Sequence, residues 1–232
     1  MPPSVSVVIP MYNEEAYVAR AVSAARQVLE GMGADWEVVV VDDASTDRTG
    51  ALADDLARAD PRVKVVHNAA NRQLGGSLRE GWARASKDLV LYTDADLPAD
   101  LAALPRAVHL LEYQQADVLA AYRFDRTSDG LRRAVLAFAY NLLVRVLFGL
   151  PVRDVNFAFK LFRRSLLERI GLRSEGSFID AELLLRARRT GAHVIQMGVD
   201  YFPRRHGSSK LSSPAVVLGI LREMGRYWSE RR

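Results

Sequence analysis

Four short apolar runs dominate the first hundred residues of the chain. They are rich in β-branched residues and do not alternate with polar residues, which is typical of strands covered by helices on both faces. The runs are VSVVIP at 5–10, WEVVVVD at 36–42, VKVVHN at 63–68 and DLVLYTD at 88–94. This pattern predicts four buried strands in the first half of the protein.

Helical patterns separate these apolar runs. They cover residues 14–30, ending near Gly31, residues 47–59, entered through the capping residues Ser45 and Asp47, and residues 73–86. Strand and helix therefore alternate at the spacing of βαβ units. We predict an α/β fold with a mostly parallel central sheet flanked by helices.

The regular alternation of predicted strands and helices ends at about residue 123. An apolar run at 116–123 precedes a long helical pattern near 131–149, a strand-like run at 156–162, a helix near 178–190 and a strand at 193–202. A polar loop at 203–213 and a last helix follow. Because no repeat or linker divides the sequence, we expect a single domain over 1–232 whose second half packs onto the first sheet.

The composition narrows the class of protein. With 49% hydrophobic and 26% charged residues, it is typical of a globular protein. The absence of cysteine excludes disulfides, thiolate metal sites and a cysteine nucleophile, so a reducing, cytoplasmic location is expected. The N-terminal MPPSVSVVIP does not read as a signal peptide, and the apolar stretch 134–150 is short and carries Arg145, which makes it a poor membrane span.

Charge is distributed unevenly between the two halves. Residues 1–120 hold 11 Lys and Arg against 18 Asp and Glu, a balance of −7, whereas residues 121–232 hold 21 against 10, a balance of +11. A basic half suits nucleic acid, an anionic membrane surface or phosphorylated ligands. No nucleic-acid partner is expected, because aromatic residues do not interleave with the arginines. The two halves would form the two sides of one cleft.

Polar side chains follow three of the predicted strands, where an open α/β sheet binds its ligands. Tyr12 and Glu14 follow the first run, Asp43 follows the second, and Asp94 and Asp96 follow the fourth. The first strand lacks the Gly-x-Gly-x-x-Gly loop, which argues against NAD or FAD.

At this edge of the predicted sheet, Asp94 and Asp96 point most specifically to a chemical role. Two neighbouring carboxylates disfavour each other's ionisation unless a cation lies between them. Mg²⁺ or Mn²⁺ prefers such oxygen ligands and would in turn neutralise a diphosphate. The alternative is that the acidic pair forms a turn leading into a helix.

The motifs "VIPMYNEE", "VVDDASTDRTG", "NRQLGGSLREG" and "YTDADL" resemble, in order and spacing, the nucleotide-sugar half of glycosyltransferase family 2. These are inverting transferases with the Rossmann-like GT-A fold. The segments "DVNFAFKLFRR" and "RRHGSSKL" are similar to the polyprenyl-phosphate sugar transferases of the dolichol-phosphate mannose synthase type. The resemblance implies a nucleotide-sugar half at 1–120, an acceptor half at 121–232 and interface helices in the second half.

The implied reaction moves mannose or glucose from GDP-mannose or UDP-glucose to a polyprenyl or dolichyl phosphate. It would take place at the inner face of the membrane, with the protein attached peripherally and Mg²⁺ or Mn²⁺ as cofactor. A soluble enzyme glycosylating a hydroxyl acceptor, or a non-catalytic nucleotide-sugar or lipid-phosphate binding module, remains open as an alternative. The sequence also leaves open whether the protein forms a homo-oligomer.

On the donor side, the resemblance implies a nucleoside site, with Asp43 accepting from the base, and a metal site that holds the donor diphosphate. The nucleoside residues are Pro10, Tyr12, Glu14 and Asp43, and the metal ligands are Asp94 and Asp96. For Tyr12 and Glu14 the alternative is a helix start, with Glu14 favoured by the helix dipole, and Asp43 could equally cap a helix.

On the acceptor side, a phosphate nucleophile is already anionic, so positioning and charge stabilisation would carry the step. Arginine forks match phosphate oxygens, and Arg123 is the first candidate, with Arg126 and Arg133 behind it. The resemblance implies a loop closing over donor and acceptor that contains the catalytic Arg204 and Lys210 and the phosphate-binding Ser209. The alternative for these cations is a solvated surface.

Two acids in "GSFIDAELLLRARRTG" correspond to the acceptor-side acid of the superfamily. Asp180 or Glu182 would be the general base for a hydroxyl acceptor, or would orient a basic neighbour if the acceptor is a phosphate. We expect Glu182 to face the cleft, and a first-turn helical acid is the alternative for Asp180.

The helix predicted at 131–149 is apolar nearly all round, broken by Asn141 and Arg145. In similar proteins helices here lie along the membrane interface and admit the lipid phosphate, and a core or dimer helix is the alternative. The chain departs from the family pattern at Pro98, where several members have a glutamine that assists at the metal, and at Gln73 and Ala158, where glycine is expected.

Overall fold

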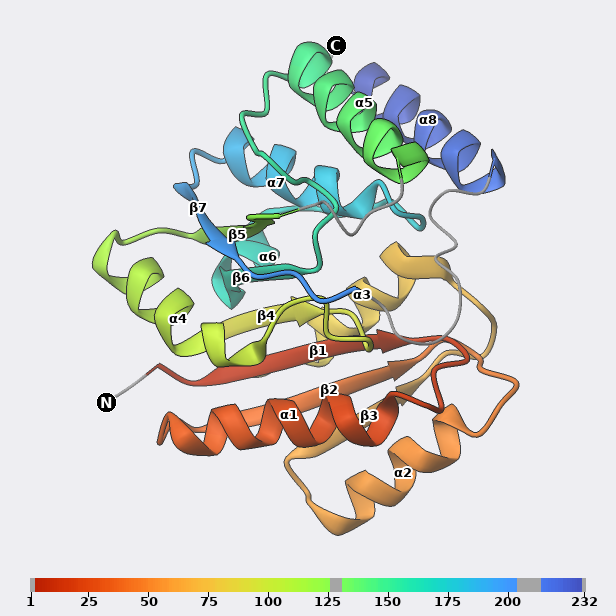
Figure 1. Ribbon diagram of the computed structural model, residues 1–232, viewed down its shortest axis with the longest axis vertical. Helices are drawn as coiled ribbons and strands as arrows, with labels where there is room; N and C mark the ends of the chain where they lie inside the picture. The colour runs from red at the N-terminus through yellow and green to blue at the C-terminus, as the bar shows by residue number, and fades with distance from the viewer. Residues whose placement is uncertain (1–2, 126–130, 204–213, 231–232) are drawn as a thin grey trace.

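The computed structural model of the protein describes residues 3–125, 131–203 and 214–230. These residues form a seven-stranded sheet covered by helices on both faces (Figure 1). The strand order is β3-β2-β1-β4-β6-β5-β7. The strands are β1 Val5–Met11, β2 Trp36–Asp42, β3 Val63–His67, β4 Leu89–Thr93, β5 Val118–Arg123, β6 Phe159–Arg163 and β7 Val194–Val199.

Most neighbouring strands run parallel, as predicted. β1 pairs in parallel with β2 and β4, β2 with β3, and β5 with β7. The exception is β6, which is antiparallel to both β4 and β5. Through β6 the strands of the second half continue the first sheet, which corrects the expectation that this half only packs onto it.

The helices alternate with the strands in the first half, close to the predicted ranges. Helices α4 and α6 and a short 3-10 helix, η1, were not predicted. The helices are α1 Val18–Gly31, α2 Thr49–Ala59, α3 Gln73–Arg84, η1 Leu101–Ala103, α4 Leu104–Tyr113, α5 Leu131–Phe148, α6 Arg164–Arg169, α7 Ile179–Arg189 and α8 Pro214–Ser229.

The start of α2 shows how polar side chains fix the rim of the sheet. Asp47 accepts a hydrogen bond from the backbone N–H of Thr49 at 2.9 Å, although the N-cap position itself is Arg48, which makes no side-chain capping bond. Ser45 does not cap α2, because its hydroxyl accepts from the backbone N–H of Asn13 at 3.0 Å instead. This bond ties the loop after β1 to the loop after β2.

The core lies on both faces of the sheet. One cluster packs α1 and α4 against side chains such as Val7 and Ile9, and the other packs α3, α7 and parts of α5 and α8 against side chains such as Val8 and Val90. Helix α3 approaches the sheet closely at Gly81, where a Cβ atom would lie 2.4 Å from Cγ1 of Val8. Burial of the strands on both faces explains their unbroken apolar sequences.

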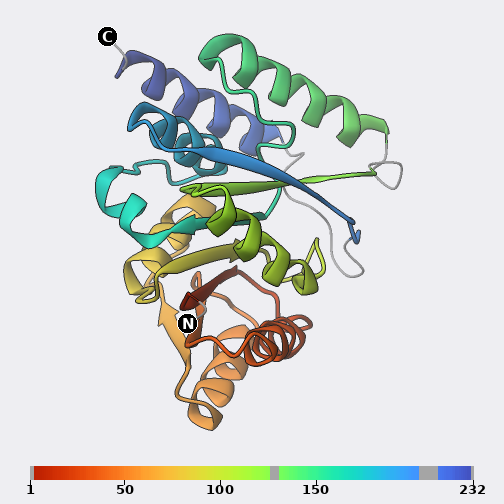
Figure 2. The ribbon, with the colours of Figure 1, turned by 90° about the vertical axis from the view of Figure 1, so that its left-hand side faces the viewer.

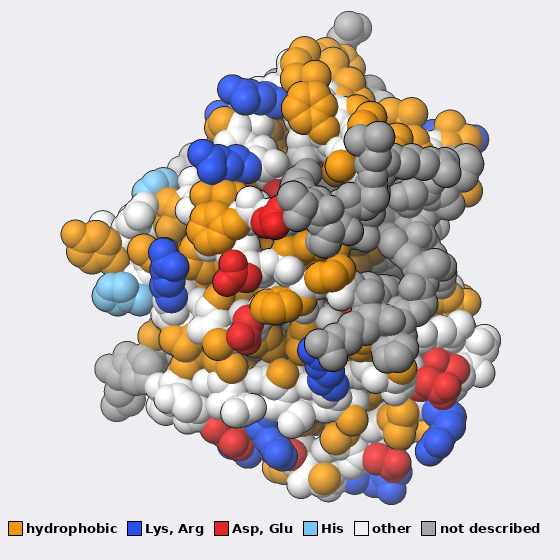
Figure 3. All heavy atoms as spheres, in the orientation of Figure 1, with side chains coloured by type: hydrophobic (Ala, Val, Ile, Leu, Met, Phe, Trp, Pro, Cys, Tyr) orange, Lys and Arg blue, Asp and Glu red, His pale blue; other side chains and the backbone are white. Residues whose placement is uncertain are grey.

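Helices α5 and α8 lie side by side at one end of the molecule, beyond α7 (Figures 1 and 2). Hydrophobic side chains gather on the surface at that end of the molecule (Figure 3). Phe138 and Val146 of α5 are 68% and 71% exposed. Trp228 of α8 is also exposed. Within the described ranges, no helix is long and apolar enough to span a bilayer.

Candidate active site

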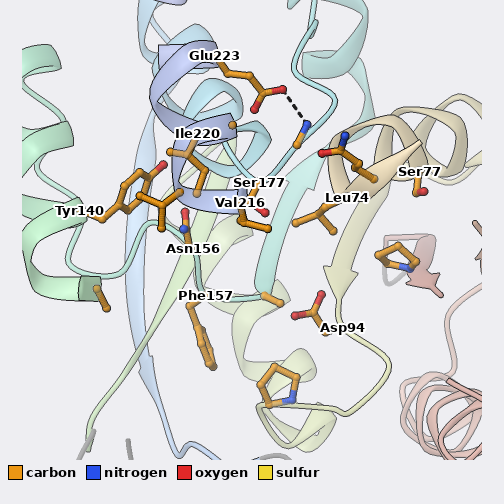
Figure 4. A pocket seen from close by; sticks show the side chains of 18 of the residues that line it. Leu74, Ser77, Asp94, Tyr140, Asn156, Phe157, Ser177, Val216, Ile220 and Glu223 are labelled. Carbon is orange, nitrogen blue, oxygen red and sulfur yellow. Dashed lines mark hydrogen bonds between the residues drawn. The ribbon is translucent and has the colours of Figure 1, made fainter. Parts of the chain in front are cut away.

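A cavity of about 1130 Å³ opens at the carboxyl edge of the parallel strands, and its far side is formed by α5 and α8. It brings together residues that are distant in the sequence. The predicted site residues among its lining are Pro10, Tyr12, Glu14, Asp43, Asp94, Asp96 and Arg123. Figure 4 shows part of this lining, with Asp94 beyond the end of β4 and Glu223 on α8.

Asp43 is held at the rim by the segment before α3. Its side chain is buried, and its Oδ1 accepts hydrogen bonds from Nδ2 of Asn68 at 2.8 Å and from the backbone N–H of Arg72 at 2.7 Å. The backbone N–H of Asp43 in turn donates to the carbonyl of Met11 at 2.8 Å. Asp43 therefore helps to anchor the start of α3 while it lines the cavity.

The loop after β1 is shaped by a residue with a left-handed backbone. Asn13 has φ of 56°, and its Oδ1 accepts from the backbone N–H of Thr46 at 2.8 Å. The backbone N–H of Glu14 donates to the hydroxyl of Thr49 at 2.8 Å. These bonds hold Tyr12 and Glu14 at the cavity, and α1 begins only at Val18, so Glu14 does not occupy its first turn.

Asp94 and Asp96 are both half-buried and line the cavity directly after β4. Oδ1 of Asp94 accepts a hydrogen bond from the hydroxyl of Tyr92 at 2.9 Å. Leu97, with φ of 52°, donates its backbone N–H to the carbonyl of Asp94 at 3.1 Å and closes a turn. The next helix is capped by Asp100, which accepts from the backbone N–H of Ala102, so the acidic pair does not serve as a helix cap.

The electrostatics of this turn agree with the repulsion expected from the sequence. Burial and the charge of Asp96 raise the pKa of Asp94 to about 7, and the hydrogen bond from Tyr92 only partly opposes them. A bound divalent cation would relieve this repulsion. Two neighbouring carboxylates are a fitting donor set for Mg²⁺ or Mn²⁺, which complete their coordination with substrate phosphates and water.

The rest of the described protein adds no further acidic ligand to this pair. Over residues 3–125, 131–203 and 214–230, no three His, Cys, Asp or Glu side chains gather as a metal site. Pro98, which stands where a glutamine was expected, also lines the cavity, and its carbonyl accepts from the backbone N–H of Phe202 at 3.0 Å. Its side chain has no atom that could coordinate a metal.

Asp180 lies behind the cavity wall, not in it. Its Oδ1 accepts from Nζ of the fully buried Lys160 at 2.5 Å, and the same ammonium donates to the carbonyl of Phe157 at 2.8 Å. Burial raises the pKa of Asp180, and Lys160 opposes that rise. Asp180 lies in the first turn of α7, as the alternative interpretation expected, and it orients a basic neighbour, Lys160.

Glu182 does not face the cleft, and that expectation is wrong. Its carboxylate is buried and accepts from the backbone N–H groups of Arg173 and Ser174 and from Nε of Arg186, the last two at 2.7 and 2.6 Å. The rotation of α7 turns the carboxylate toward this loop. Its role in the structure is to hold the segment that precedes α7.

Arg123 lines the cavity, but its guanidinium is already bound. Its Nε donates to Oδ2 of Asp154 at 2.8 Å, and its Nη2 to Oδ1 at 3.3 Å. The side chain is mostly buried and also lies over the ring of Tyr201, 5.0 Å from the centroid. The predicted residues Arg126, Arg204, Ser209 and Lys210 lie outside the described residues, as does the side chain of Arg133.

The lining also contains polar residues that were not predicted from the sequence. Among them are residues of α5, of the segment before β6 and of α8, namely Tyr140, Asn156, Arg222, Glu223 and Arg226. Oε1 of Glu223 accepts from the backbone N–H groups of Glu175 and Gly176, both at 2.8 Å. Figure 4 marks one hydrogen bond of this carboxylate with a dashed line. The sequence signal that could have found the α8 residues is their spacing on an otherwise apolar helix.

Comparison with known proteins agrees with this architecture. The chain is 34% identical over 231 residues to glycosyltransferase AglD of Haloferax volcanii, covering 97% of this chain and 37% of that protein. It is 34% identical over 230 residues to polyprenol monophosphomannose synthase of Mycolicibacterium smegmatis, covering 90% of this chain and 82% of that protein. An undecaprenyl-phosphate 4-deoxy-4-formamido-L-arabinose transferase of Pectobacterium carotovorum is 32% identical over 90% of this chain and 63% of its own length.

Glucosyl-3-phosphoglycerate synthase of Mycobacterium tuberculosis has the same fold. Its structure in complex with phosphoglyceric acid superposes with a TM-score of 0.73 at 22% identity, covering 96% of this chain and 80% of that one. Another structure of that enzyme contains Mn²⁺, UDP and glucosyl-3-phosphoglycerate. The α/β sheet with its antiparallel β6 is therefore a GT-A-like fold. Residues 6–171 match the family described as "Glycosyl transferase family 2", and the chain belongs to that family.

Proposed function

We propose that the protein is an inverting glycosyltransferase that moves a hexose from a nucleotide-diphosphate sugar to a polyprenyl phosphate at the cytoplasmic surface of a membrane. The observation that carries the proposal is one cavity that joins Asp94 and Asp96 to an apolar wall made by α5 and α8. In this view residues 1–120 bind the donor and residues 121–232 bind the acceptor, within one domain.

The donor would bind along the carboxyl ends of β1, β2 and β4. A nucleoside fits between Tyr12, whose ring can pack against a base, and Asp43, whose carboxylate can accept from a base N–H. Pro10 and Glu14 line the same end of the cavity. Asp94 and Asp96 would hold Mg²⁺ or Mn²⁺, which supplies charge neutralisation for the diphosphate when it is bound.

The acceptor would attack from the side of α5 and α8. A phosphate oxygen of the lipid forms a bond to the anomeric carbon while the bond from that carbon to the nucleoside diphosphate breaks, so the configuration is inverted and the nucleoside diphosphate leaves. Arg222 and Arg226 line the cavity from α8 and are exposed, which suits them to an anionic acceptor. We also propose acceptor-side roles for Arg126, Arg133, Arg204, Ser209 and Lys210.

Two features favour a phosphate over a hydroxyl as the acceptor. A hydroxyl needs a base, whereas Asp180 and Glu182 are both buried and bound to other groups outside the cavity lining. The curated relatives named for polyprenol monophosphomannose and undecaprenyl-phosphate products act on lipid phosphates, according to their names. The chain spans 37% of AglD and 63% of the undecaprenyl-phosphate 4-deoxy-4-formamido-L-arabinose transferase, so the complete activities of these relatives are carried over only as proposals.

A membrane position would follow from the exposed apolar surface of α5 and α8. Side chains of this kind insert into the headgroup boundary of a bilayer, and flanking arginines are attracted to anionic lipids. A peripheral attachment would bring the cavity to the height at which a polyprenyl phosphate presents its headgroup.

A partition assay tests the proposal. The purified protein is incubated with radiolabelled GDP-mannose or UDP-glucose, Mn²⁺ or Mg²⁺, and undecaprenyl phosphate or dolichyl phosphate in detergent. We expect label to enter the organic phase, and to be lost with EDTA and with Asp96→Ala. Label on a soluble hydroxyl acceptor and none on lipid would overturn the lipid-phosphate assignment, and nucleotide binding without any transfer would favour a binding module.

A further inference from the structure

Three buried polar atoms line the part of the cavity formed by α5, α8 and the segment before β6. They are the hydroxyl of Tyr140, Oδ1 of Asn156 and Oε2 of Glu223 (Figure 4). Each is shielded from solvent and makes no hydrogen bond within the described residues. Buried polar atoms without partners destabilise a protein, and three from separate elements in one cavity indicate a ligand that completes them.

The chemistry of this cluster selects hydrogen-bond donors. Oδ1 of Asn156 and Oε2 of Glu223 are acceptors, and a tyrosine hydroxyl both donates and accepts. Burial and the charges of Asp180 and Glu223 raise the pKa of Tyr140, so its hydroxyl keeps its proton. Hydroxyl groups satisfy all three atoms, whereas an anionic group is repelled by the carboxylate of Glu223.

The carboxylate of Glu223 is fixed in place and keeps one oxygen available. Its Oε1 is held by the backbone N–H groups of Glu175 and Gly176. A Cβ atom at Gly176 would lie 3.0 Å from Oε2, so glycine leaves that oxygen uncrowded. Because this side chain is already fixed, it loses little conformational entropy when a ligand hydroxyl binds to Oε2.

The sheet register brings this cluster next to the acidic pair. Thr93 of β4 is paired with Phe159 of the antiparallel β6. Asp94 follows Thr93, and Asn156 lies three residues before Phe159, so the two segments leave the sheet at the same edge. A group attached to a diphosphate at Asp94 would therefore extend into the cavity that Asn156, Tyr140 and Glu223 also line.

We propose that Tyr140, Asn156 and Glu223 bind hydroxyl groups of the transferred sugar, and that Glu223 selects an uncharged sugar over one that carries a carboxylate. This inference rests on the proposed function and extends it to the identity of the donor. The acceptor phosphate is left to the exposed Arg222 and Arg226, which line the same cavity. A polyprenyl chain suits the cluster poorly, because hydrocarbon offers no donor to a buried carboxylate.

Binding measured with and without the sugar tests the inference. In titration calorimetry with Mn²⁺, we expect Glu223→Gln and Tyr140→Phe each to lower the affinity for UDP-glucose or GDP-mannose about tenfold. This is the effect of losing one hydrogen bond to a buried polar group. UDP and GDP alone should bind as they do to the wild type. Matched control variants outside the cavity are Glu168→Gln and Tyr113→Phe, at residues whose side chains are exposed.

The selectivity arm compares UDP-glucose with UDP-glucuronate. The wild type is expected to bind UDP-glucose more tightly than UDP-glucuronate. Glu223→Gln should reduce the ratio of these two affinities at least fivefold, because it removes the repelling charge. An unchanged preference in the variant would overturn the selective role of Glu223.

The outcomes also separate this inference from the proposed function. In two cases the wild type binds and transfers sugar, and the inference alone is wrong. In the first, the two variants lose as much affinity for free nucleotide as for nucleotide sugar. In the second, they raise only the KM for polyprenyl phosphate. If the wild type binds no nucleotide sugar in the presence of Mn²⁺ or Mg²⁺, both the proposed function and the inference about the sugar site are wrong.

Discussion

At the scale of single residues, Lys160 connects the site to the core. It is a fully buried cation on β6 that donates to Asp180 of α7 and to the carbonyl of Phe157, and its Nζ lies 5.6 Å from the ring centroid of Tyr92. Tyr92 in turn donates to Asp94. Lys160 is thus linked to the acidic pair through Tyr92, although it is not itself part of the cavity lining.

Removing the ammonium group of Lys160 is expected to lower the free energy of unfolding. Lys160→Met would leave the Asp180 carboxylate buried without its partner, which destabilises a protein by about 3–5 kcal/mol. Urea denaturation measures the free energy of unfolding. The control is Lys87→Met, which removes a pairing with the exposed Asp35 and should change stability by less than about 1 kcal/mol. Equal effects of the two variants would show that the buried pair contributes nothing specific.

Glu37 makes a pH-dependent contribution to stability. Burial alone would raise its pKa, but hydrogen bonds from Lys64, Ser6 and Ser86 outweigh burial and lower the pKa from 4.5 to about 2. A carboxylate with a lowered pKa stabilises the fold fully above its unfolded value and loses that contribution as the pH falls through the folded one. The wild-type advantage over Glu37→Gln should thus be constant above pH 5.5 and shrink between about pH 4.5 and 2. Denaturation at several pH values checks this, and a pH-independent difference would contradict it.

Some residues of the site could be predicted and others could not, for a physical reason. The donor-side residues follow directly after buried strands, and the carboxyl end of a parallel strand has a known place in an α/β sheet. The direction of Glu182 depends on the rotation of α7 about its axis, which its sequence leaves open because both sides of the helix are buried. Tyr140 and Glu223 reach the cavity only through the packing of α5 and α8.

At the scale of elements, α5 is unusual because its apolar residues divide between inside and outside. Val144 and Phe148 are buried against the second core cluster, whereas Phe138, Leu142 and Val146 are exposed. The helix was predicted from its sequence, but which residues face inward depends on its contact with α8 and α7. Helix α4 was not predicted, although Pro105 in its first turn is a favourable residue at a helix start.

The exposed side of α5 should bind lipid. Phe138→Asp combined with Val146→Asp replaces two exposed apolar side chains by charges that resist transfer into a bilayer. We expect at least a tenfold loss of cosedimentation with vesicles that contain phosphatidylglycerol. Tyr113→Asp, on the distant α4, serves as the control and should behave as the wild type. Equal sedimentation of all three proteins would exclude α5 as the contact surface.

At the scale of the whole molecule, the cavity draws on both halves of the chain. The first half provides acids such as Asp94 and Asp96, whereas the second half provides charged residues of both signs, for example Arg222 and Glu223. Within the described lining, the acidic excess of the first half is therefore found at the site, but the basic excess of the second half is not. The antiparallel direction of β6 was the feature that strand patterns could not reveal, because burial on both faces looks the same in either direction.

Ligand binding across this cavity should stabilise the molecule only when the metal site is intact. At a hundredfold excess over its Kd, UDP or GDP with Mn²⁺ adds about 2.7 kcal/mol, which for a chain of this size raises Tm by about 5–10 °C. EDTA, or Asp94→Asn with Asp96→Asn, should remove most of this rise in a thermal denaturation experiment. A full rise in the presence of EDTA would mean that nucleotide binds without a metal.

The pairing of β4 with β6 has a consequence for synthesis on the ribosome. Residues 94–158 separate the two strands, and at roughly 5–20 residues per second they take several seconds to emerge. During that time one edge of β4, in the middle of the future sheet, has no neighbour and can pair with another nascent chain. The second half of the protein therefore also covers a strand edge through which the first half alone could aggregate.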